Sequence, residues 1–238
     1  MTFSVRVEMA QQQLLVTNNE FVFSSGNEHR VYLTKPITAP SHYTELFELL
    51  ASATEQETIH FFINTPGGRV DTTSQLCTLL ENCEAELIGH LVGVAASAGS
   101  VIPMFMDALS VSPYAYMMIH NYSGGTYGKG DDIVLSAQNT KQWVETLYRS
   151  CYEHFLTKDE LENIIFKNQD IYLSPQQIEE RWENVLRKRE EAMEAFATEM
   201  TAAQREEVKN LVRDEIIAEY RAQSAAARKQ KKQLQTAQ

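Results

Sequence analysis

The chain has 238 residues, 43% of them apolar, and a formal net charge of −11. This length and composition predict one main domain with a packed core and room for an appendage, and the negative charge argues against nucleic acid as a main partner. The cysteines are odd in number and lack metal-ligand spacing, so no metal and no cofactor are expected, and reduced thiols in a cytoplasmic protein are expected at Cys77, Cys83 and Cys151. The start of the sequence has no apolar signal core, and no apolar run is long enough to span a membrane.

Strand-like and helix-like segments alternate along most of the sequence. The predicted strands are residues 30–34, 60–64, 86–94, 108–111 and 116–120. The predicted helices are residues 41–53, 72–81, 97–106 and 131–155. Repeated strand–helix–strand units imply an α/β fold with a largely parallel sheet and right-handed crossovers.

A further helical region is predicted beyond Ser174. Ser174 and Gln177 form the pattern of an N-cap with a capping box, and apolar residues follow at helical spacing from Trp182 to Tyr220. A long apolar stripe must be buried, so we favour association with a partner or with itself over a tail that packs on its own domain. Residues 221–238 are basic, contain no acid and are expected to fray in solution.

The most informative segment is the run of small residues at 93–100, which surrounds Ser97. At a strand-to-helix junction, a hydroxyl and backbone N–H groups can be exposed together, as acyl transfer requires. Such chemistry also needs a base and a group that orients the base, which His120 and Asp170 could supply. Other carboxylates available for the second role are Asp131, Asp132 and Asp159. Small residues at such a junction also serve simply to let two backbones pack closely.

Two more segments place glycines next to a predicted strand. One strand runs into residues 66–68, Pro-Gly-Gly, where glycines let backbone N–H groups turn toward a bound carbonyl oxygen. The strand that ends at His120 is followed by a glycine-rich stretch at 123–130. This stretch does not fit a phosphate-binding loop, because that pattern requires glycine where Ser123 stands and a hydroxyl residue where Gly130 stands.

Four segments in order resemble the Clp protease proteolytic subunit (ClpP) family of serine peptidases. They are Ile-Asn-Thr-Pro-Gly-Gly at 63–68, Gly-Val-Ala-Ala-Ser-Ala-Gly at 93–99, Met-Ile-His at 118–120 and Asp-Ile-Tyr-Leu-Ser-Pro at 170–175. The resemblance implies the ClpP/crotonase-like fold, with repeated β-β-α/β-α units and a projecting handle at about residues 123–160. Beyond Ser174 the sequence departs from the family, and the helical C-terminal extension is predicted from the apolar spacing instead. We therefore expect an N-terminal segment at 1–30, a peptidase domain at 31–178 and the extension at 179–238.

The resemblance also implies roles for individual residues. The implied catalytic triad is a nucleophile, a general base and an orienting carboxylate, at Ser97, His120 and Asp170 respectively. The implied oxyanion hole consists of the backbone N–H groups of Gly68 and Ala98. The implied contacts to an extended substrate strand come from Gly67, Gly124 and Gly125. The sequence departs from the family at Asn121-Tyr122, where Gln-Pro is usual, and at Asn168-Gln169, where many members have Asp-Arg.

The implied activity is endopeptidase cleavage of protein or peptide substrates inside a homo-oligomeric, heptameric ring, either as a single ring or as two stacked rings. In one version an AAA+ unfoldase feeds the chamber and alone consumes ATP. In another, the chain is a phage head-maturation protease that acts on scaffold or capsid protein in the host cytoplasm. The alternatives from other classes are a crotonase-type acyl-CoA enzyme and a non-catalytic ring or scaffold subunit. The presence of all three triad candidates, Ser97, His120 and Asp170, counts against the first, and the intact Ser97–His120 pair counts against the second.

Overall fold

A computed structural model of the chain describes residues 22–199 and residue 204. The chain divides into two units between Leu186 and Arg187. The sheet, the helices that pack on it and the candidate site all belong to the first unit. No helix among the described residues has the length and apolar character needed to cross a membrane.

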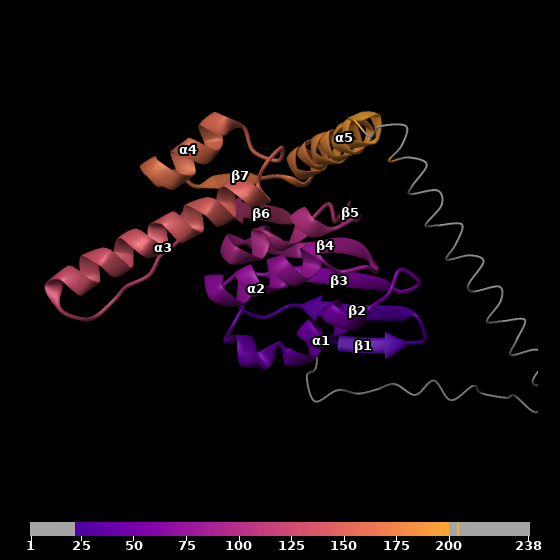
Figure 1. Ribbon diagram of the computed structural model, residues 1–238, viewed down its shortest axis with the longest axis horizontal. Coiled ribbons are helices and arrows are strands. Elements are labelled where there is room, and N and C mark those ends of the chain that lie inside the picture. Colours follow the sequence, from indigo (N-terminus) through magenta and orange to yellow (C-terminus); the bar gives the residue numbers. More distant parts are fainter. Residues whose placement is uncertain (1–21, 200–203, 205–238) are drawn as a thin grey trace, which may run out of the picture. The chain divides into compact units, whose positions relative to one another are not determined.

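A seven-stranded, mostly parallel sheet forms the centre of the first unit (Figure 1). Its order is β1 (Val22–Ser25), β2 (Glu28–Leu33), β3 (Thr58–Thr65), β4 (Glu86–Ala96), β6 (Tyr116–Ile119) and β7 (Ile171–Leu173), with β5 (Ala108–Val111) paired to β4. The pairs among β2, β3, β4, β5 and β6 are parallel, whereas the edge strands β1 and β7 are antiparallel to their neighbours. The predicted α/β fold with a largely parallel sheet is therefore confirmed.

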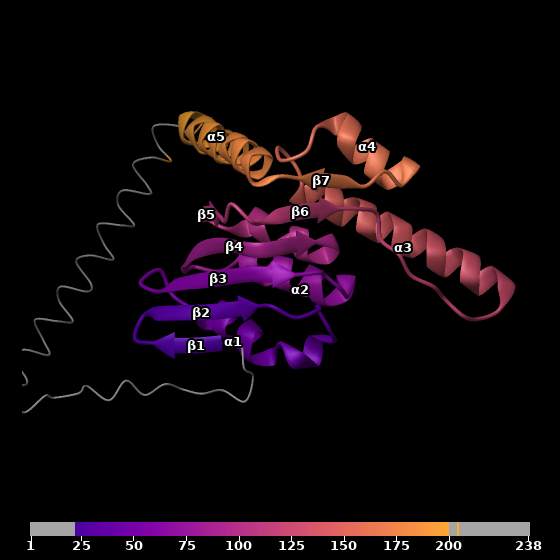
Figure 2. The ribbon, with the colours of Figure 1, turned by 180° about the vertical axis from the view of Figure 1, so that it is seen from behind.

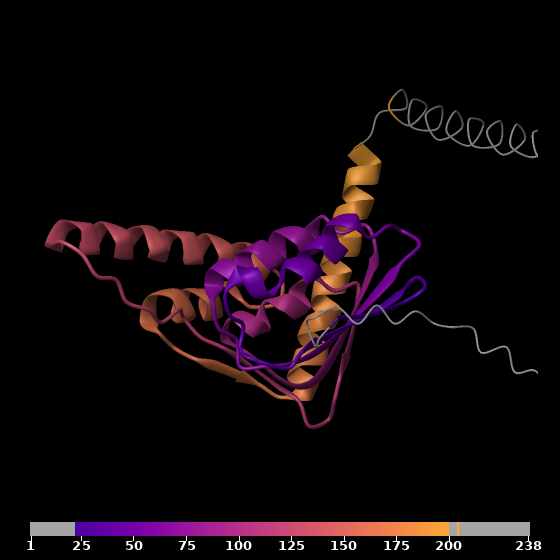
Figure 3. The same ribbon diagram turned by 90° about the horizontal axis from the view of Figure 1, so that it is seen from below.

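The alternation of side chains along β3 explains why one face of the sheet is covered. Ile59, Phe61 and Ile63 are fully buried, while the residues between them are half-exposed. The helices α1 (Thr44–Ser52) and α2 (Val70–Glu81) pack their apolar sides against this buried face. Figure 3 shows both helices on the same side of the sheet, and Figure 2 shows the strands lying in front of them.

The segment 97–106 differs from the single helix that we predicted. It forms two short 3₁₀ helices, η2 (Ser97–Ser100) and η3 (Ile102–Phe105). Ser97 has a φ of +53°, which is outside the right-handed helical region. Pro103 lies in the first turn of η3, where its ring and missing N–H prevent an α-helix from continuing through it. The backbone therefore turns at the end of β4 and again before Met106.

Two helices connect β6 to the edge strand β7. The long helix predicted at 131–155 is confirmed as α3 (Gly130–Cys151), whose N-terminal half extends away from the sheet (Figure 3). Sequence reasoning missed α4 (Lys158–Lys167). Thr157 and Glu160 form a complete capping box at its start, and this Thr-x-x-Glu spacing is the signal that could have located it.

The helix predicted after Ser174 is confirmed as α5 (Pro175–Glu199). The Ser174 N–H donates to Gln177 Oε1 at 2.9 Å, and the Gln177 N–H donates to Ser174 Oγ at 3.4 Å. These are the two bonds of the predicted capping box.

The first turns of α5 pack on the core of their own unit, contrary to the expectation that the whole apolar stripe is kept for a partner. Ile178, Trp182 and Val185 are at most 5% exposed and belong to the hydrophobic core. Farther along the stripe, Leu186 and Met193 are exposed. The apolar residues from Phe196 to Tyr220 lie outside the residues whose side chains are described. The division into a peptidase domain and an extension remains a proposal, and the burial of Trp182 favours a boundary after residue 186 rather than after 178.

An ion pair between Glu160 and Arg181 joins α4 to α5. The Arg181 guanidinium donates from Nη1 to Oε2 at 2.9 Å and from Nη2 to Oε1 at 2.7 Å. The pair of bonds holds the pKa of Glu160 at about 2, below its usual value of 4.5. A carboxyl with a lowered folded-state pKa stabilises the fold above pH 4.5, and this contribution is lost as the pH falls from 4.5 toward 2.

We therefore expect Glu160→Gln to lower the free energy of unfolding at pH 7 by about 1–2 kcal/mol, after allowance for solvent screening. The difference from the wild type should shrink as the pH falls below 4.5, because the unfolded wild-type chain then binds a proton at Glu160 while the folded carboxylate, with its pKa of about 2, stays ionised, and this favours unfolding. Urea unfolding at pH 7 and pH 3 measures both effects. Glu183→Gln, an exposed change on α5, is the control. If Glu160→Gln lowers the free energy of unfolding by the same amount at pH 7 and at pH 3, this account is wrong.

Candidate active site

The candidate site begins where β4 ends. Ser97, the next residue, has a φ of +53°, a left-handed conformation that costs a non-glycine residue on the order of 1–3 kcal/mol. Its flanking residues from Ala95 to Ser100 are buried, whereas Ser97 itself is partly exposed. A sharp turn of this kind between a strand and a helical segment presents a hydroxyl above the edge of the sheet.

His120 follows the neighbouring strand β6. The strands β4 and β6 run parallel, with Ala96 paired to Met118, so their carboxyl ends meet at one edge of the sheet. His120 Nε2 lies 2.6 Å from Ser97 Oγ. In the tautomer with the proton on Nδ1, the hydroxyl donates to Nε2, which is the arrangement in which an imidazole can accept the serine proton.

Asp170 immediately precedes β7, the strand on the other side of β6. Because Ile119 pairs with Ile171 in this antiparallel ladder, the backbones of His120 and Asp170 lie opposite each other. The Asp170 side chain is exposed, and within the described part of the chain no hydrogen bond or ion pair links it to His120. The other carboxylates considered lie in the first turns of α3 and α4 and make no such bond either: Asp131, Asp132 and Asp159.

The two departures from the family pattern are in contact with each other. Asn121 Nδ2 donates to Asn168 Oδ1 at 3.0 Å and to the Ile165 carbonyl at 3.1 Å. Asn168 has a φ of +50° and ends α4. The bond therefore ties the residue after His120 to the segment that leads into Asp170.

The glycines at 67 and 68 bring a second loop against the Ser97 turn. Gly67 has a φ of +87°, and a Cβ there would collide with the Ala96 carbonyl and lie 2.8 Å from Ala98 N. Gly68 forms a parallel bridge with Ile37 that uses the Gly67 carbonyl and the Arg69 N–H. The Gly68 N–H takes no part in this bridge, and the loop that carries it packs against the serine turn, which contains Ala98.

Two polar side chains next to this loop were not identified from the sequence. Thr65, fully buried, donates from Oγ1 to the Lys35 carbonyl at 2.8 Å and accepts from the Gly67 N–H at 3.1 Å. Asn64 Oδ1 accepts from the Val94 N–H at 3.0 Å. Both fix the loop to neighbouring backbone. Their position directly before Pro-Gly-Gly is the signal that could have suggested this role.

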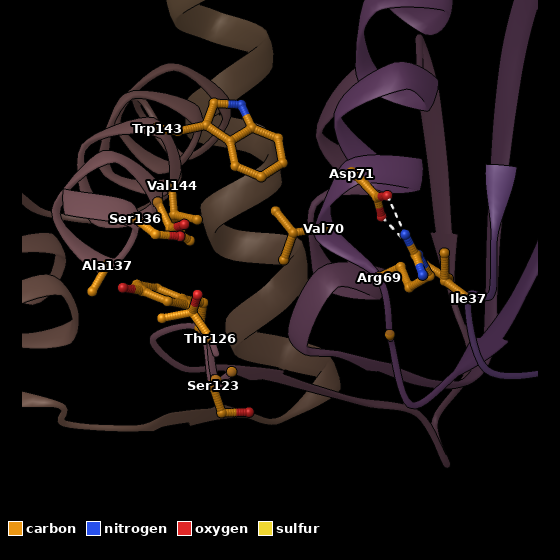
Figure 4. A pocket seen from close by; sticks show the side chains of 15 residues that line it. Ile37, Arg69, Val70, Asp71, Ser123, Thr126, Ser136, Ala137, Trp143 and Val144 are labelled. Carbon is orange, nitrogen blue, oxygen red and sulfur yellow. Dashed lines mark hydrogen bonds and ion pairs between the residues drawn. The ribbon is translucent and has the colours of Figure 1, made fainter. Parts of the chain in front are cut away.

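A pocket of about 820 Å³ lies beside these loops (Figure 4). The segment 68–71 and Ile37 form one wall, and residues 122–126 with α3 form the other. Trp143 and Val70 face each other across it in Figure 4, and the Arg69–Asp71 ion pair lies on the side of Ile37. The glycines at 124 and 125 are part of the lining, and a Cβ at either would meet no atom within 4 Å.

No group of three or more metal-ligating side chains is placed to hold an ion within the described residues. The three thiols are free, and the buried Cys77 lies beside Cys151, which is the main cause of a raised pKa of the Cys77 thiol.

In a comparison with protein-family models, residues 20–180 match the family described as Clp protease. The matched range is well over half of the chain. It contains every strand of the sheet, the residues Ser97, His120 and Asp170 and the lining of the pocket, and it ends within the first two turns of α5.

Proposed function

The chain belongs to the Clp protease family of serine peptidases, and we propose that it cleaves peptide bonds with Ser97 as its nucleophile. The observation that carries this proposal is the 2.6 Å contact between Ser97 Oγ and His120 Nε2. A serine hydroxyl is a weak nucleophile without a base in hydrogen-bonding contact, and this contact supplies one.

In the proposed reaction Ser97 Oγ attacks the substrate carbonyl carbon while its proton passes to His120 Nε2. The N–H groups of Gly68 and Ala98 donate to the oxygen that becomes negatively charged, and loss of one such donor costs about 3 kcal/mol of transition-state stabilisation. His120 then gives the proton to the leaving amine, and water hydrolyses the acyl-enzyme by the reverse sequence. Asp170, opposite His120 in the ladder, turns toward Nδ1 to orient the imidazole and stabilise its charged form.

Labelling with a fluorophosphonate probe tests this function directly. We expect one covalent adduct per chain, mapped by peptide mass spectrometry to Ser97. An adduct at another serine, or no adduct on folded protein that hydrolyses peptides, would overturn the assignment. A thioester-hydration assay with acyl-CoA substrates tests the crotonase alternative. Activity on acyl-CoA without peptide hydrolysis would favour a crotonase-type enzyme.

The glycine-rich stretch is proposed to pair with the backbone of an extended substrate. Glycines allow another backbone to approach closely, and those at 124 and 125 line the pocket with no atom over them.

Valine substitutions at Gly124 and Gly125 should therefore raise the KM for peptides about tenfold, with kcat little changed, because they remove uniform substrate binding. The fold should tolerate them, since a Cβ at either position is unopposed. The matched control is Gly130→Val. A Cβ at Gly130 also meets no atom within 4 Å, but this residue begins α3 and does not line the pocket. Steady-state kinetics on a fluorogenic peptide measure the effect. Wild-type KM values in both variants would contradict substrate pairing along this stretch.

Membership of the family indicates ring assembly and protein substrates. We propose a homo-oligomeric, heptameric ring, and a light-scattering mass equal to that of one chain would contradict it. The helix α5 runs to Glu199, beyond the end of the family match at 180, and this extension favours a scaffold-cleaving phage protease over a chamber that serves an unfoldase. Hydrolysis of a folded protein only with an AAA+ partner and ATP would reverse that preference.

A further inference from the structure

Tyr148 of α3 and Tyr152, the C-cap of that helix, are linked to the Ser97–His120 pair, one directly and one through Ser100. The Tyr148 hydroxyl donates to the carbonyl of His120 at 2.9 Å. The Tyr152 hydroxyl lies 2.6 Å from Ser100 Oγ, and Ser100 Oγ donates to the carbonyl of Ser97 at 2.6 Å. Neither tyrosine is part of the proposed triad or of the pocket lining.

The direction of each bond follows from proton counting. The single proton of Ser100 Oγ goes to the Ser97 carbonyl, so the Tyr152 hydroxyl must be the donor to Ser100. The His120 carbonyl can only accept, so Tyr148 donates as well. Burial raises the pKa of Tyr148 to about 12 and raises the pKa of Tyr152 well above its usual range, so both hydroxyls keep their protons at neutral pH.

Packing makes the two tyrosines a rigid unit. Tyr148 and Tyr152 are 3% and 1% exposed, and Ser100 is fully buried. The tyrosines lie one helical turn apart, with their rings edge to face and their centroids 5.5 Å apart. One helix thus holds the carbonyl of the proposed base directly and that of the proposed nucleophile through a single hydroxyl.

The conformation of Ser97 needs such a restraint. A non-glycine residue at positive φ persists only where its surroundings hold it. The orientation of the Ser97 carbonyl and the direction of its Oγ are set by the same backbone turn. A change in the Tyr152–Ser100 link therefore alters where the hydroxyl points relative to His120 Nε2.

We propose that Tyr148 and Tyr152 are positioning residues, which align His120 and Ser97 for acyl transfer by fixing their carbonyl groups to one helix. The inference rests on the proposed function. It assigns to the C-terminal end of α3 a role in the rate of the chemical step and no role in substrate binding.

Tyr148→Phe and Tyr152→Phe keep the packed rings and remove only the hydroxyls. Each should lower kcat on the order of 10- to 100-fold, since a displacement of about 1 Å in a reacting group costs about 100-fold. The KM should stay unchanged, and the rate constant for covalent fluorophosphonate labelling should fall in parallel with kcat. Tyr114→Phe, at a site that is 90% exposed, is the matched control. Thermal melting curves establish that each variant is folded at the assay temperature.

A double-mutant cycle with Ser100→Ala tests the route. Tyr152→Phe should cause no further loss in the Ser100→Ala background, because both changes break the same link, whereas Tyr148→Phe should cause a further loss through His120. If Tyr152→Phe does not fold, Ser100→Ala tests the same link by itself. We expect it to lower kcat and to leave KM unchanged.

The outcomes separate this inference from the proposed function. Tyrosine variants with a lowered melting temperature but a wild-type kcat would overturn the positioning role and leave the proposed function standing. An additive loss for Tyr152→Phe in the Ser100→Ala background would overturn the route through Ser100. A wild-type protein that is not labelled at Ser97 would overturn the function itself.

Discussion

Ser97→Ala should abolish peptide hydrolysis and probe labelling while leaving the fold and any assembly intact. Removing the nucleophile of a serine-protease triad lowers kcat by a factor on the order of 10⁶. Among the described residues the Ser97 hydroxyl forms a side-chain hydrogen bond with His120. Ser100 donates to the backbone carbonyl of residue 97, and this bond does not depend on the side chain there. Alanine tolerates the same left-handed turn about as well as serine does, so the free energy of unfolding should change little.

Peptide hydrolysis and fluorophosphonate labelling of the same preparation measure this loss. Ser112→Ala, in the turn between β5 and β6, is a control hydroxyl deletion. His120→Ala should cause a loss of similar order, and the double variant should be hardly worse than either single one, because members of a triad act as a unit. Labelling that persists in Ser97→Ala would end the assignment of the nucleophile.

The sequence indicated Ser97 by its run of small residues at a strand-to-helix junction and His120 by its place at the end of a predicted strand. The two lie together in the structure because β4 and β6 are parallel neighbours, whose carboxyl ends meet at one edge of the sheet. The apolar run within residues 60–64 and the Pro-Gly-Gly turn predicted a buried strand followed by a helix, as β3 and α2 are. These features depend on local pattern, which a single sequence contains.

Features that depend on contacts between distant segments were not predictable in the same way. The left-handed turn at Ser97, which replaced a predicted helix, exists because Gly67 lets another loop pack against it. Tyr148 and Tyr152 occupy ordinary core positions of a helical stripe, and nothing in their spacing indicates that their hydroxyls reach carbonyls near His120 and Ser97. The apolar periodicity along α5 predicted a face that contains Trp182. It did not indicate that Trp182 is buried against the core of its own domain.

The position of Asp170 depends on register rather than on pattern. The three-residue strand β7 is too short to give a period-two signal, and only its pairing with β6 places Asp170 opposite His120. The Asn121–Asn168 bond next to it joins two positions at which the chain departs from its family. The sequence showed each of these two departures separately. It did not show that Asn121 and Asn168 are in contact.

Gly67→Ala is expected to remove activity and to destabilise the fold far more than Gly26→Ala does. Both glycines have a left-handed φ, +87° and +62°, so alanine brings conformational strain of about 1 kcal/mol at either position. A Cβ at Gly26 meets no atom within 4 Å, whereas one at Gly67 would collide with the Ala96 carbonyl. Relief of such a clash costs about 1–3 kcal/mol beyond the strain.

The clash falls on the backbone that carries the proposed nucleophile. Ala96 and Ala98 flank Ser97, and their backbone atoms cannot withdraw from a new Cβ without rotating the serine turn away from His120. The labelling rate of folded Gly67→Ala should therefore fall by about 100-fold or more, while that of Gly26→Ala stays near the wild type. Urea unfolding of both variants gives the stability difference, and labelling well below the unfolding midpoint isolates the effect on the site. A Gly67→Ala protein that labels at the wild-type rate would show that the two loops do not meet as closely as Gly67 requires.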